Sequence, residues 1–264
     1  MSPGPLLGTG RTAEVFEWGD GRALKLLLPG LPADWLTSEA EKTSAARDSG
    51  APAPAVYEQV EVEDRSGVVF DRVGSASMLD EIISSPWRVW GWGVRLAEIH
   101  ANVLGCRSTR LPDVKEMLAA KIDMAEVVPA AHRKAAKDSL LRLPDGDAVL
   151  HGDFHPDNVF STATGPVLID WTEGARGHPG ADLVRTLWLL SASAVPDDLP
   201  RRRLALLLVG LLRRSYLRRC LRLTGVSRVE LEGWWFPVIA ARLSEGITAE
   251  EAALVRKVRQ LAGG

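Results

Sequence analysis

The chain has 264 residues, of which 46% are hydrophobic and 25% charged, a balance typical of a globular protein with a substantial core. A formal net charge of only −2 gives no general attraction to nucleic acid or to an anionic membrane. The longest apolar run, residues 204–212, is too short to span a bilayer, and the N-terminus lacks a signal-peptide pattern. Two cysteines without metal or redox spacing favour a reducing compartment, so we expect a cytoplasmic protein.

The first part of the chain predicts a small antiparallel sheet. Residues 6–28 alternate short apolar runs with glycines, and the Asp20-Gly21 step is a strong hairpin signal, so we expect two or three strands there. Two further strand-like runs, at 55–62 and 67–73, are separated by a turn predicted at residues 64–67.

One helix interrupts this sheet pattern. Residues 34–49 suit a helix that ends at Gly50, because prolines at 52 and 54 prevent its continuation. The first ~75 residues are therefore predicted to form a sheet with one helix.

From residue 78 onward the apolar spacing becomes helical. The pattern predicts a helix over 87–104, a helical stretch over 113–142 that breaks at Pro129, and helices after Asp182, with a strand-and-loop segment at 148–171 between them. We therefore expect an α+β fold of two lobes. Residues 1–74 would form the sheet-rich lobe and residues 75–264 a larger, mostly helical lobe.

The segment from Val149 to Phe160 holds the most informative residues. A polar loop between two apolar runs carries Asp153 and Asn158, five residues apart, and the second run ends at Asp170. Phosphoryl transfer needs a carboxylate near the attacking hydroxyl and hard oxygen ligands for Mg²⁺. Asp153 fits the first role, and Asn158 and Asp170 fit the second.

The motif His-Gly-Asp-x-x-x-x-Asn followed by Ile-Asp-Trp resembles the signature of the aminoglycoside phosphotransferase and choline-kinase-like family, which has a protein-kinase-like fold. The resemblance implies that Asp153 is the catalytic base and that Asn158 and Asp170 bind Mg²⁺. It further implies that Asp182, at a helix start, braces the catalytic loop.

The resemblance extends to the N-terminal part. Gly8 and Gly10 open a stretch similar to the phosphate-covering loop of kinases, with Ala13 in place of its third glycine. Lys25, on the following strand, is similar to the lysine that contacts the α/β-phosphates. Glu39 is expected to pair with it, with Glu41 as the second choice.

Residues 70–74 resemble the hinge between kinase lobes. The resemblance implies that its backbone, from Asp71 to Val73, hydrogen-bonds the adenine ring. Asp157 stands where many relatives carry glycine, which is a departure from the family pattern.

Two other functions stay open at this stage. His151, Asp153, His155 and Asp157 alternate, so an extended strand would place them on one side, as in a divalent-metal hydrolase. The second alternative is a non-catalytic kinase-like module that binds nucleotide.

The favoured interpretation is a small-molecule kinase that uses ATP and Mg²⁺, with GTP left open as donor. Its partner would be a hydroxyl compound of unknown identity, and the oligomeric state is not readable. Residues 201–264 hold 13 Lys or Arg but five Asp or Glu, and the basic run 201–222 argues mildly against a polycationic aminoglycoside. Acidic Asp157, Glu173 and Asp182 near the motif weaken that argument.

Overall fold

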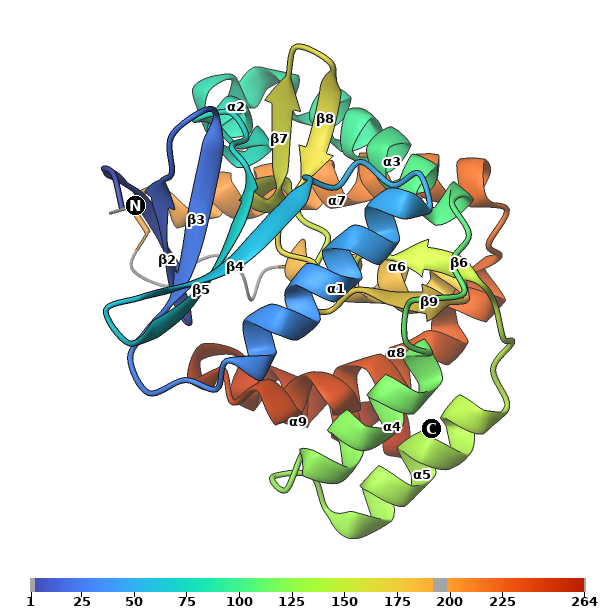
Figure 1. The fold of residues 1–264 in the computed structure, drawn as a ribbon. Coiled ribbons are helices and arrows are strands. Elements are labelled where there is room, and N and C mark those ends of the chain that lie inside the picture. The colour runs from blue at the N-terminus through green and yellow to red at the C-terminus, as the bar shows by residue number, and fades with distance from the viewer. Residues whose placement is uncertain (1–2, 192–198, 264) are drawn as a thin grey trace.

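A five-stranded antiparallel sheet forms the N-terminal part of the protein (Figure 1). The computed structural model describes residues 3–191 and 199–263. The strand order is β1-β2-β3-β5-β4, with β3 at the centre. The strands are β1 (Leu6–Thr9), β2 (Ala13–Glu17), β3 (Arg22–Leu27), β4 (Val56–Val62) and β5 (Arg65–Asp71).

The turns of this sheet follow its sequence signals, with one correction. Gly19, Asp20 and Gly21 all have positive φ, as the hairpin between β2 and β3 requires. The turn between β4 and β5 is not at residues 64–67 but at Glu63-Asp64, whose φ angles are 52° and 60°. Gly67 instead lies inside β5, where a Cβ would come within 2.7 Å of the Leu24 side chain. That glycine therefore reflects close packing and not a turn.

Helix α1 (Asp34–Asp48) lies beside the sheet, as expected from residues 34–49. It has a weak apolar stripe, and Leu36 and Ala40 form a small core with Leu27, Val68 and Phe70. The rest of α1 turns toward the helical part, where Ala45 and Ala46 join the main core. One helix thus contacts both parts of the molecule.

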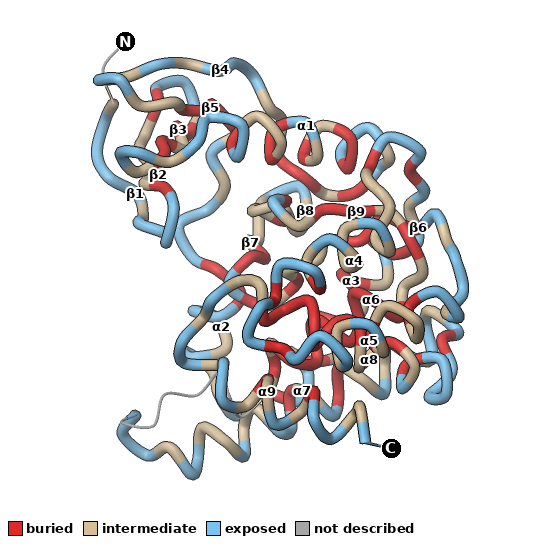
Figure 2. Tube along the Cα trace, turned by 90° about the horizontal axis from the view of Figure 1, so that it is seen from below, coloured by how far each residue is buried: buried red, intermediate tan, exposed pale blue. Residues whose placement is uncertain are grey.

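The remainder of the described chain is mostly helical, and its buried residues form the main core (Figure 2). The largest fully buried side chains there include Trp171, Trp234 and Tyr216. The helices are α2 (Met78–Ser84), η1 (Pro86–Arg88), α3 (Val89–Gly105), α4 (Val114–Met124), α5 (Ala130–Leu141), η2 (Pro156–Asn158), α6 (Pro179–Leu189), α7 (Arg202–Thr224), α8 (Arg228–Arg242), η4 (Leu243–Glu245) and α9 (Thr248–Ala262).

The predicted break at Pro129 is confirmed, because α4 ends at Met124 and α5 begins at Ala130. The strand-and-loop segment contains β6 (Ala148–Leu150), β7 (Val159–Thr162) and β8 (Gly165–Leu168). Strand β9 (Ala175–Gly177), which pairs with β6, was not predicted from the sequence. The mixed fold class is confirmed, and the boundary at residue 74 stays a prediction.

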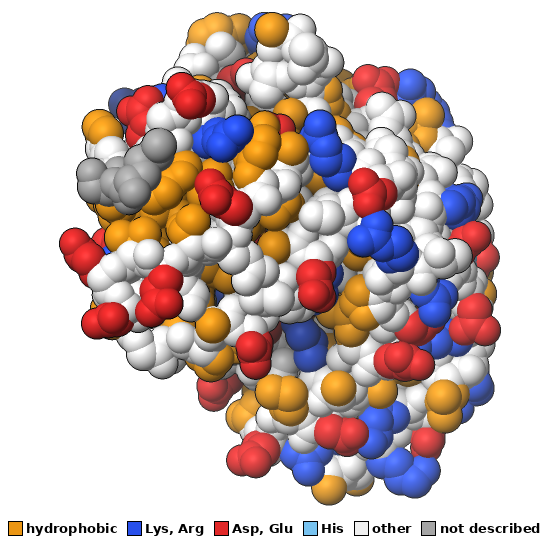
Figure 3. All heavy atoms as spheres, viewed as in Figure 1, with side chains coloured by type: hydrophobic (Ala, Val, Ile, Leu, Met, Phe, Trp, Pro, Cys, Tyr) orange, Lys and Arg blue, Asp and Glu red, His pale blue; other side chains and the backbone are white. Residues whose placement is uncertain are grey.

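Charge is interspersed over the face shown in Figure 3, where acidic and basic side chains alternate with apolar ones. This face therefore carries no extended field of one sign. None of the described helices is long and apolar enough to cross a membrane.

Candidate active site

The loop that follows β6 is held in place by Asp182 of α6. The Asp182 carboxylate accepts hydrogen bonds from the backbone N–H of His151 at 2.6 Å and of Gly152 at 3.0 Å. Gly152 has φ of 76°, and a Cβ there would come within 2.3 Å of the Glu173 carbonyl oxygen. Only glycine fits this position without a backbone shift. The brace that the resemblance implied for Asp182 is present.

Further contacts behind Asp182 were not predicted from the sequence. His100 Nε2 lies 3.1 Å from the Asp182 carboxylate, and its Nδ1 lies 2.5 Å from the Tyr216 hydroxyl. The same ring stacks on Phe154 of the loop, with centroids 4.0 Å apart. No motif links these residues, because they come from α3, the loop and α7.

His151 is buried, and both of its ring nitrogens are occupied. Nδ1 accepts from the Asp153 backbone N–H at 3.3 Å, so Nε2 carries the proton and donates to the Ile169 carbonyl at 3.0 Å. Burial lowers the pKa of His151, which keeps the ring neutral. His151 therefore joins the loop that follows β6 to the segment that follows β8.

These contacts do not support the metal-hydrolase alternative. The required alternation fails because the segment is a loop followed by the turn η2 (Pro156–Asn158), and Asp157 accepts from the Ser77 hydroxyl at 2.9 Å. Among the described residues, no group of three or more His, Cys, Asp or Glu side chains could hold a metal ion.

Asp153 lies between two basic side chains. Its Oδ1 accepts from Nη2 of Arg185 at 3.3 Å, and its Oδ2 lies 3.6 Å from His155 Nε2. Burial alone would raise the pKa of Asp153, but His155 and the Arg185 charge outweigh it and hold that pKa well below its usual range. The carboxylate is thus ionised and partly exposed, as an acceptor of a substrate hydrogen bond must be.

Asn158 and the residue before Asp170 are joined by a backbone hydrogen bond, from the Ile169 N–H to the Asn158 carbonyl at 3.1 Å. The Asn158 amide donates to the Asp153 carbonyl at 2.9 Å, which leaves its side-chain oxygen available as a ligand. Asp170 has φ of 62°, and its side chain, 40% exposed, accepts from the Thr172 hydroxyl at 2.7 Å. An amide oxygen and a carboxylate are hard ligands, so this pair fits Mg²⁺.

Lys25 of β3 reaches the same carboxylate from the sheet. Its ammonium contacts both Glu39 oxygens at 2.7 Å and lies 3.6 Å from Asp170 Oδ1. Glu41 is exposed, so Glu39 and not the second choice is the partner. Burial lowers the pKa of Lys25, but Glu39 and Asp170 outweigh it, so the pKa is raised and the lysine stays charged.

The predicted loop residues lie in edge strand β1 and its turn, and the predicted hinge residues lie at and after the end of β5. Gly8 pairs with Val15, and Gly10 donates to the Ala13 carbonyl at 2.8 Å, so the two glycines form a tight β1–β2 hairpin. Asp71 ends β5, and its carboxylate accepts from the Ala55 N–H and the Tyr57 hydroxyl. Val73 follows in the connection to α2.

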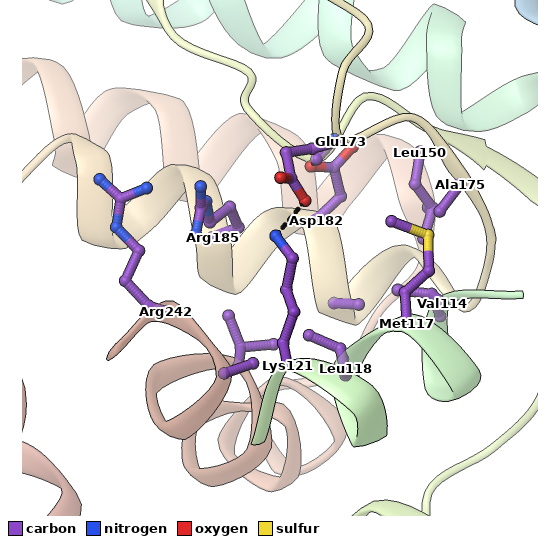
Figure 4. Close-up of a pocket in the computed structure, with 14 residues that line it drawn as sticks. Val114, Met117, Leu118, Lys121, Leu150, Glu173, Ala175, Asp182, Arg185 and Arg242 are labelled. Carbon is purple, nitrogen blue, oxygen red and sulfur yellow. Dashed lines mark hydrogen bonds and ion pairs between the residues drawn. The ribbon is translucent and has the colours of Figure 1, made fainter. Parts of the chain in front are cut away.

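A pocket opens beside the loop (Figure 4). Apolar side chains, mainly from α4 and α8, form about half of its wall, and Gly152, Asp182 and Arg185 join it to the loop that follows β6. Its charged lining also includes Lys121 and Glu173, which form an ion pair, and Arg242. Sequence reasoning missed Arg185, although its position three residues after Asp182 places both on one face of α6.

The fold and this set of residues define the protein-kinase-like class. A family model described as a phosphotransferase enzyme family matches residues 6–219, and the chain belongs to that family. The sequence matched none of the curated proteins with which it was compared.

Solved structures share the fold at low sequence identity. An aminoglycoside-3′-phosphotransferase of type VIII is 20% identical, with a TM-score of 0.62, and the match covers 89% of this chain and 90% of that one. The amicoumacin kinase hAmiN, solved with AMP-PNP, Ca²⁺ and Ami, is 11% identical, with a TM-score of 0.61 and coverage of 97% and 86%. A putative fructosamine-3-kinase from Haemophilus somnus 129PT is 10% identical, with a TM-score of 0.60 and coverage of 97% and 90%.

Proposed function

We propose that the protein transfers the terminal phosphate of ATP to a hydroxyl of a small molecule. The observation that carries this proposal is the convergence of Lys25 from the sheet and Asp170 from the helical part, 3.6 Å apart, beside Asp153 and Asn158. This is the charge arrangement that phosphoryl transfer uses. Family membership and the AMP-PNP complex of one structural relative support it.

Each residue receives a role under this proposal. Residues 1–74 bind nucleotide, with Gly8 and Gly10 over the phosphates and the backbone from Asp71 to Val73 at the base. Lys25, held by Glu39, contacts the α/β-phosphates. Residues 75–264 supply the proposed metal ligands, the base and the acceptor pocket.

Asn158 and Asp170 would hold Mg²⁺, which when bound neutralises charge on the β- and γ-phosphates. Asp153 accepts a hydrogen bond from the acceptor hydroxyl, aligns it for attack and takes its proton. The pocket would bind the rest of the acceptor, because two of its lining residues adjoin Asp153: Gly152 precedes it in the chain, and Arg185 donates to its carboxylate.

Nucleotide binding tests the proposal directly. We expect Mg·ATP, and more weakly ATP without Mg²⁺, to raise the melting temperature of the wild type. Asp170→Ala should remove the Mg²⁺-dependent part of that shift, whereas Asp113→Ala, which loses a helix cap and an ion pair with Arg176, should keep it. Absence of any shift with Mg·ATP or Mg·GTP would contradict the proposal.

A further inference from the structure

The acidic side chains of the pocket beside Asp153 are all engaged within the protein. Glu173 is ion-paired to Lys121 (Figure 4). Asp182 is 2% exposed and accepts from two backbone N–H groups, with His100 at 3.1 Å. A ligand ammonium group would therefore meet Glu173 only beside the ammonium of Lys121, and it would find Asp182 buried.

Two cations of the pocket, Arg185 and Arg242, are held by glutamates that do not line it. Arg185 donates to Glu245 at 2.6 Å, and Arg242 contacts Glu245 at 2.6 Å and Glu250 at 2.7 Å. Lys121 pairs with Glu173 in the lining and lies 3.8 Å from Glu245. The pocket lining thus presents three cations, Lys121, Arg185 and Arg242, against two carboxylates, Glu173 and the buried Asp182.

Arg185 also has an unused donor. Only 8% of the residue is exposed, its two terminal nitrogens bind Glu245 and Asp153, and its buried Nε has no partner among residues 3–191 and 199–263. A buried donor without a partner is costly. Arg185 is therefore fixed by Glu245 and Asp153, and it keeps its charge at the pocket wall.

The rest of the wall is apolar. It is formed by side chains of α4, the β6 and β9 strands, the start of α6, and α8, namely Val114, Met117, Leu118, Leu150, Ala175, Ala181, Val238 and Ala241. Such a surface gains free energy from burying an apolar face of a ligand and offers nothing to a densely charged one.

We propose that the acceptor is a neutral or acidic hydroxyl compound with an apolar face, and not a polycation. This inference rests on the proposed function, since it takes the pocket beside Asp153 as the acceptor site. The sequence argument against a polycationic acceptor relied on the basic run at 201–222, which does not line this pocket. The present argument relies instead on Lys121, Arg185 and Arg242, which do.

The test is transfer of labelled phosphate from γ-labelled ATP to hydroxyl compounds sorted by charge. Kanamycin and streptomycin represent polycations, and chloramphenicol, phlorizin and pantothenate represent neutral or acidic compounds with an apolar face. We expect at least one of the latter to have kcat/KM about 100-fold above both polycations, because like charges oppose binding. Equal or better transfer to a polycation, or no transfer to any neutral or acidic compound, overturns the proposal.

A charge reversal sharpens the result. Lys121→Glu leaves two carboxylates, one new and one from the unpaired Glu173, and should narrow that ratio by about tenfold. Lys134→Glu makes the same change on the exposed face of α5 and should leave the ratio unchanged. Lys121→Gln serves if Lys121→Glu does not fold, since it also frees Glu173. If neither Lys121→Glu nor Lys121→Gln changes the ratio of kcat/KM values, the proposal is overturned.

Stabilisation by Mg·ATP is measured on every variant in parallel. If it persists while the charge preference fails, only the acceptor class is wrong. If it is absent from the wild type, the proposed function fails and the inference with it.

Discussion

Two cations, the partly buried Lys25 and the buried Arg185, each contact one of the two site carboxylates. Lys25 of the sheet binds Glu39 and reaches Asp170, and Arg185 of α6 binds Glu245 and reaches Asp153. Each cation thus joins one carboxylate of the supporting structure to one carboxylate of the site.

The two site carboxylates differ in which part of the fold holds the cation that contacts them. Asp170 is tied to the N-terminal sheet, so the relative position of sheet and helices sets its environment. Asp153 is tied to α6 and η4, so the helical part alone fixes it. The environment of Asp170 depends on both parts of the protein, and that of Asp153, the proposed base, depends on one.

The largest expected effect comes from the proposed base itself. Asp153→Asn should lower turnover by about 10²–10⁴-fold, because the acceptor hydroxyl loses its proton acceptor. Mg·ATP stabilisation should stay, since Asp170 and Lys25 are untouched. Transfer of γ-labelled phosphate measures the first and melting temperature the second. Asp157→Asn makes the same chemical change in the same loop and should cost far less; equal losses in both variants would remove Asp153 from the mechanism.

Breaking the pair on the sheet side should mainly lower stability and nucleotide binding. Lys25→Met leaves Glu39 buried without its partner, and we expect a loss of about 3 kcal/mol in the free energy of unfolding, measured with urea. The double variant Lys25→Met/Glu39→Leu should recover part of that loss. Lys134→Met, which breaks an exposed pair with Asp138, should cost at most about 0.5 kcal/mol. A double variant less stable than Lys25→Met would contradict a buried, coupled pair.

Asp182→Asn tests the brace beneath the base. An amide N–H₂ would face one of the two backbone donors, so we expect a loss of about 2 kcal/mol at pH 7. Burial would raise the pKa of Asp182, but His100 and the loop hydrogen bonds hold it below its usual value.

That depressed pKa gives the pH dependence a definite sign. The wild-type contribution is fully present above the unfolded pKa of about 3.9 and is lost as pH falls toward the folded value. Urea midpoints of the two proteins should therefore converge in acid. A gap that stays constant with pH would show that the Asp182 charge is not the cause.

The smallest expected effect is that of the second cation. Arg185→Gln removes a charge that lowers the pKa of Asp153, so the acid limb of the kcat profile should move to higher pH, with turnover at pH 7 reduced by about tenfold. Arg185→Lys keeps a positive charge and should restore part of the turnover at pH 7 and part of the original position of the acid limb. A lower kcat with no shift of the acid limb would indicate that Arg185 acts only through packing.

The sequence was sufficient where function imposes spacing along the chain. Asp153, Asn158 and Asp170 fall within one segment, and Lys25 lies on a strand after a glycine pair. The structure brings Lys25 to Asp170 and Asn158 to the Asp153 backbone, and the roles of these residues stay predictions. Local signals also placed α1 and the break at Pro129, because proline and glycine act on their own neighbourhood.

The parts that were missed depend on tertiary contacts. His100, Tyr216 and Phe154 meet only when α3, the loop and α7 pack, and Glu245 reaches Arg185 across 60 residues. The turn at Glu63-Asp64 was misplaced because Gly67 looks like a turn residue, whereas packing against Leu24 requires it. A single residue outside any motif does not indicate from the sequence which distant residue it will contact.

The ammonium of Lys42 on α1 donates to the Thr172 carbonyl at 2.6 Å, two residues after Asp170. Together with the Lys25–Asp170 contact, it links the N-terminal part to the segment that follows β8. A motion that separates the two parts must break both contacts. Under the proposed function, release of spent nucleotide would therefore depend on the position of α1, the helix that also carries Glu39.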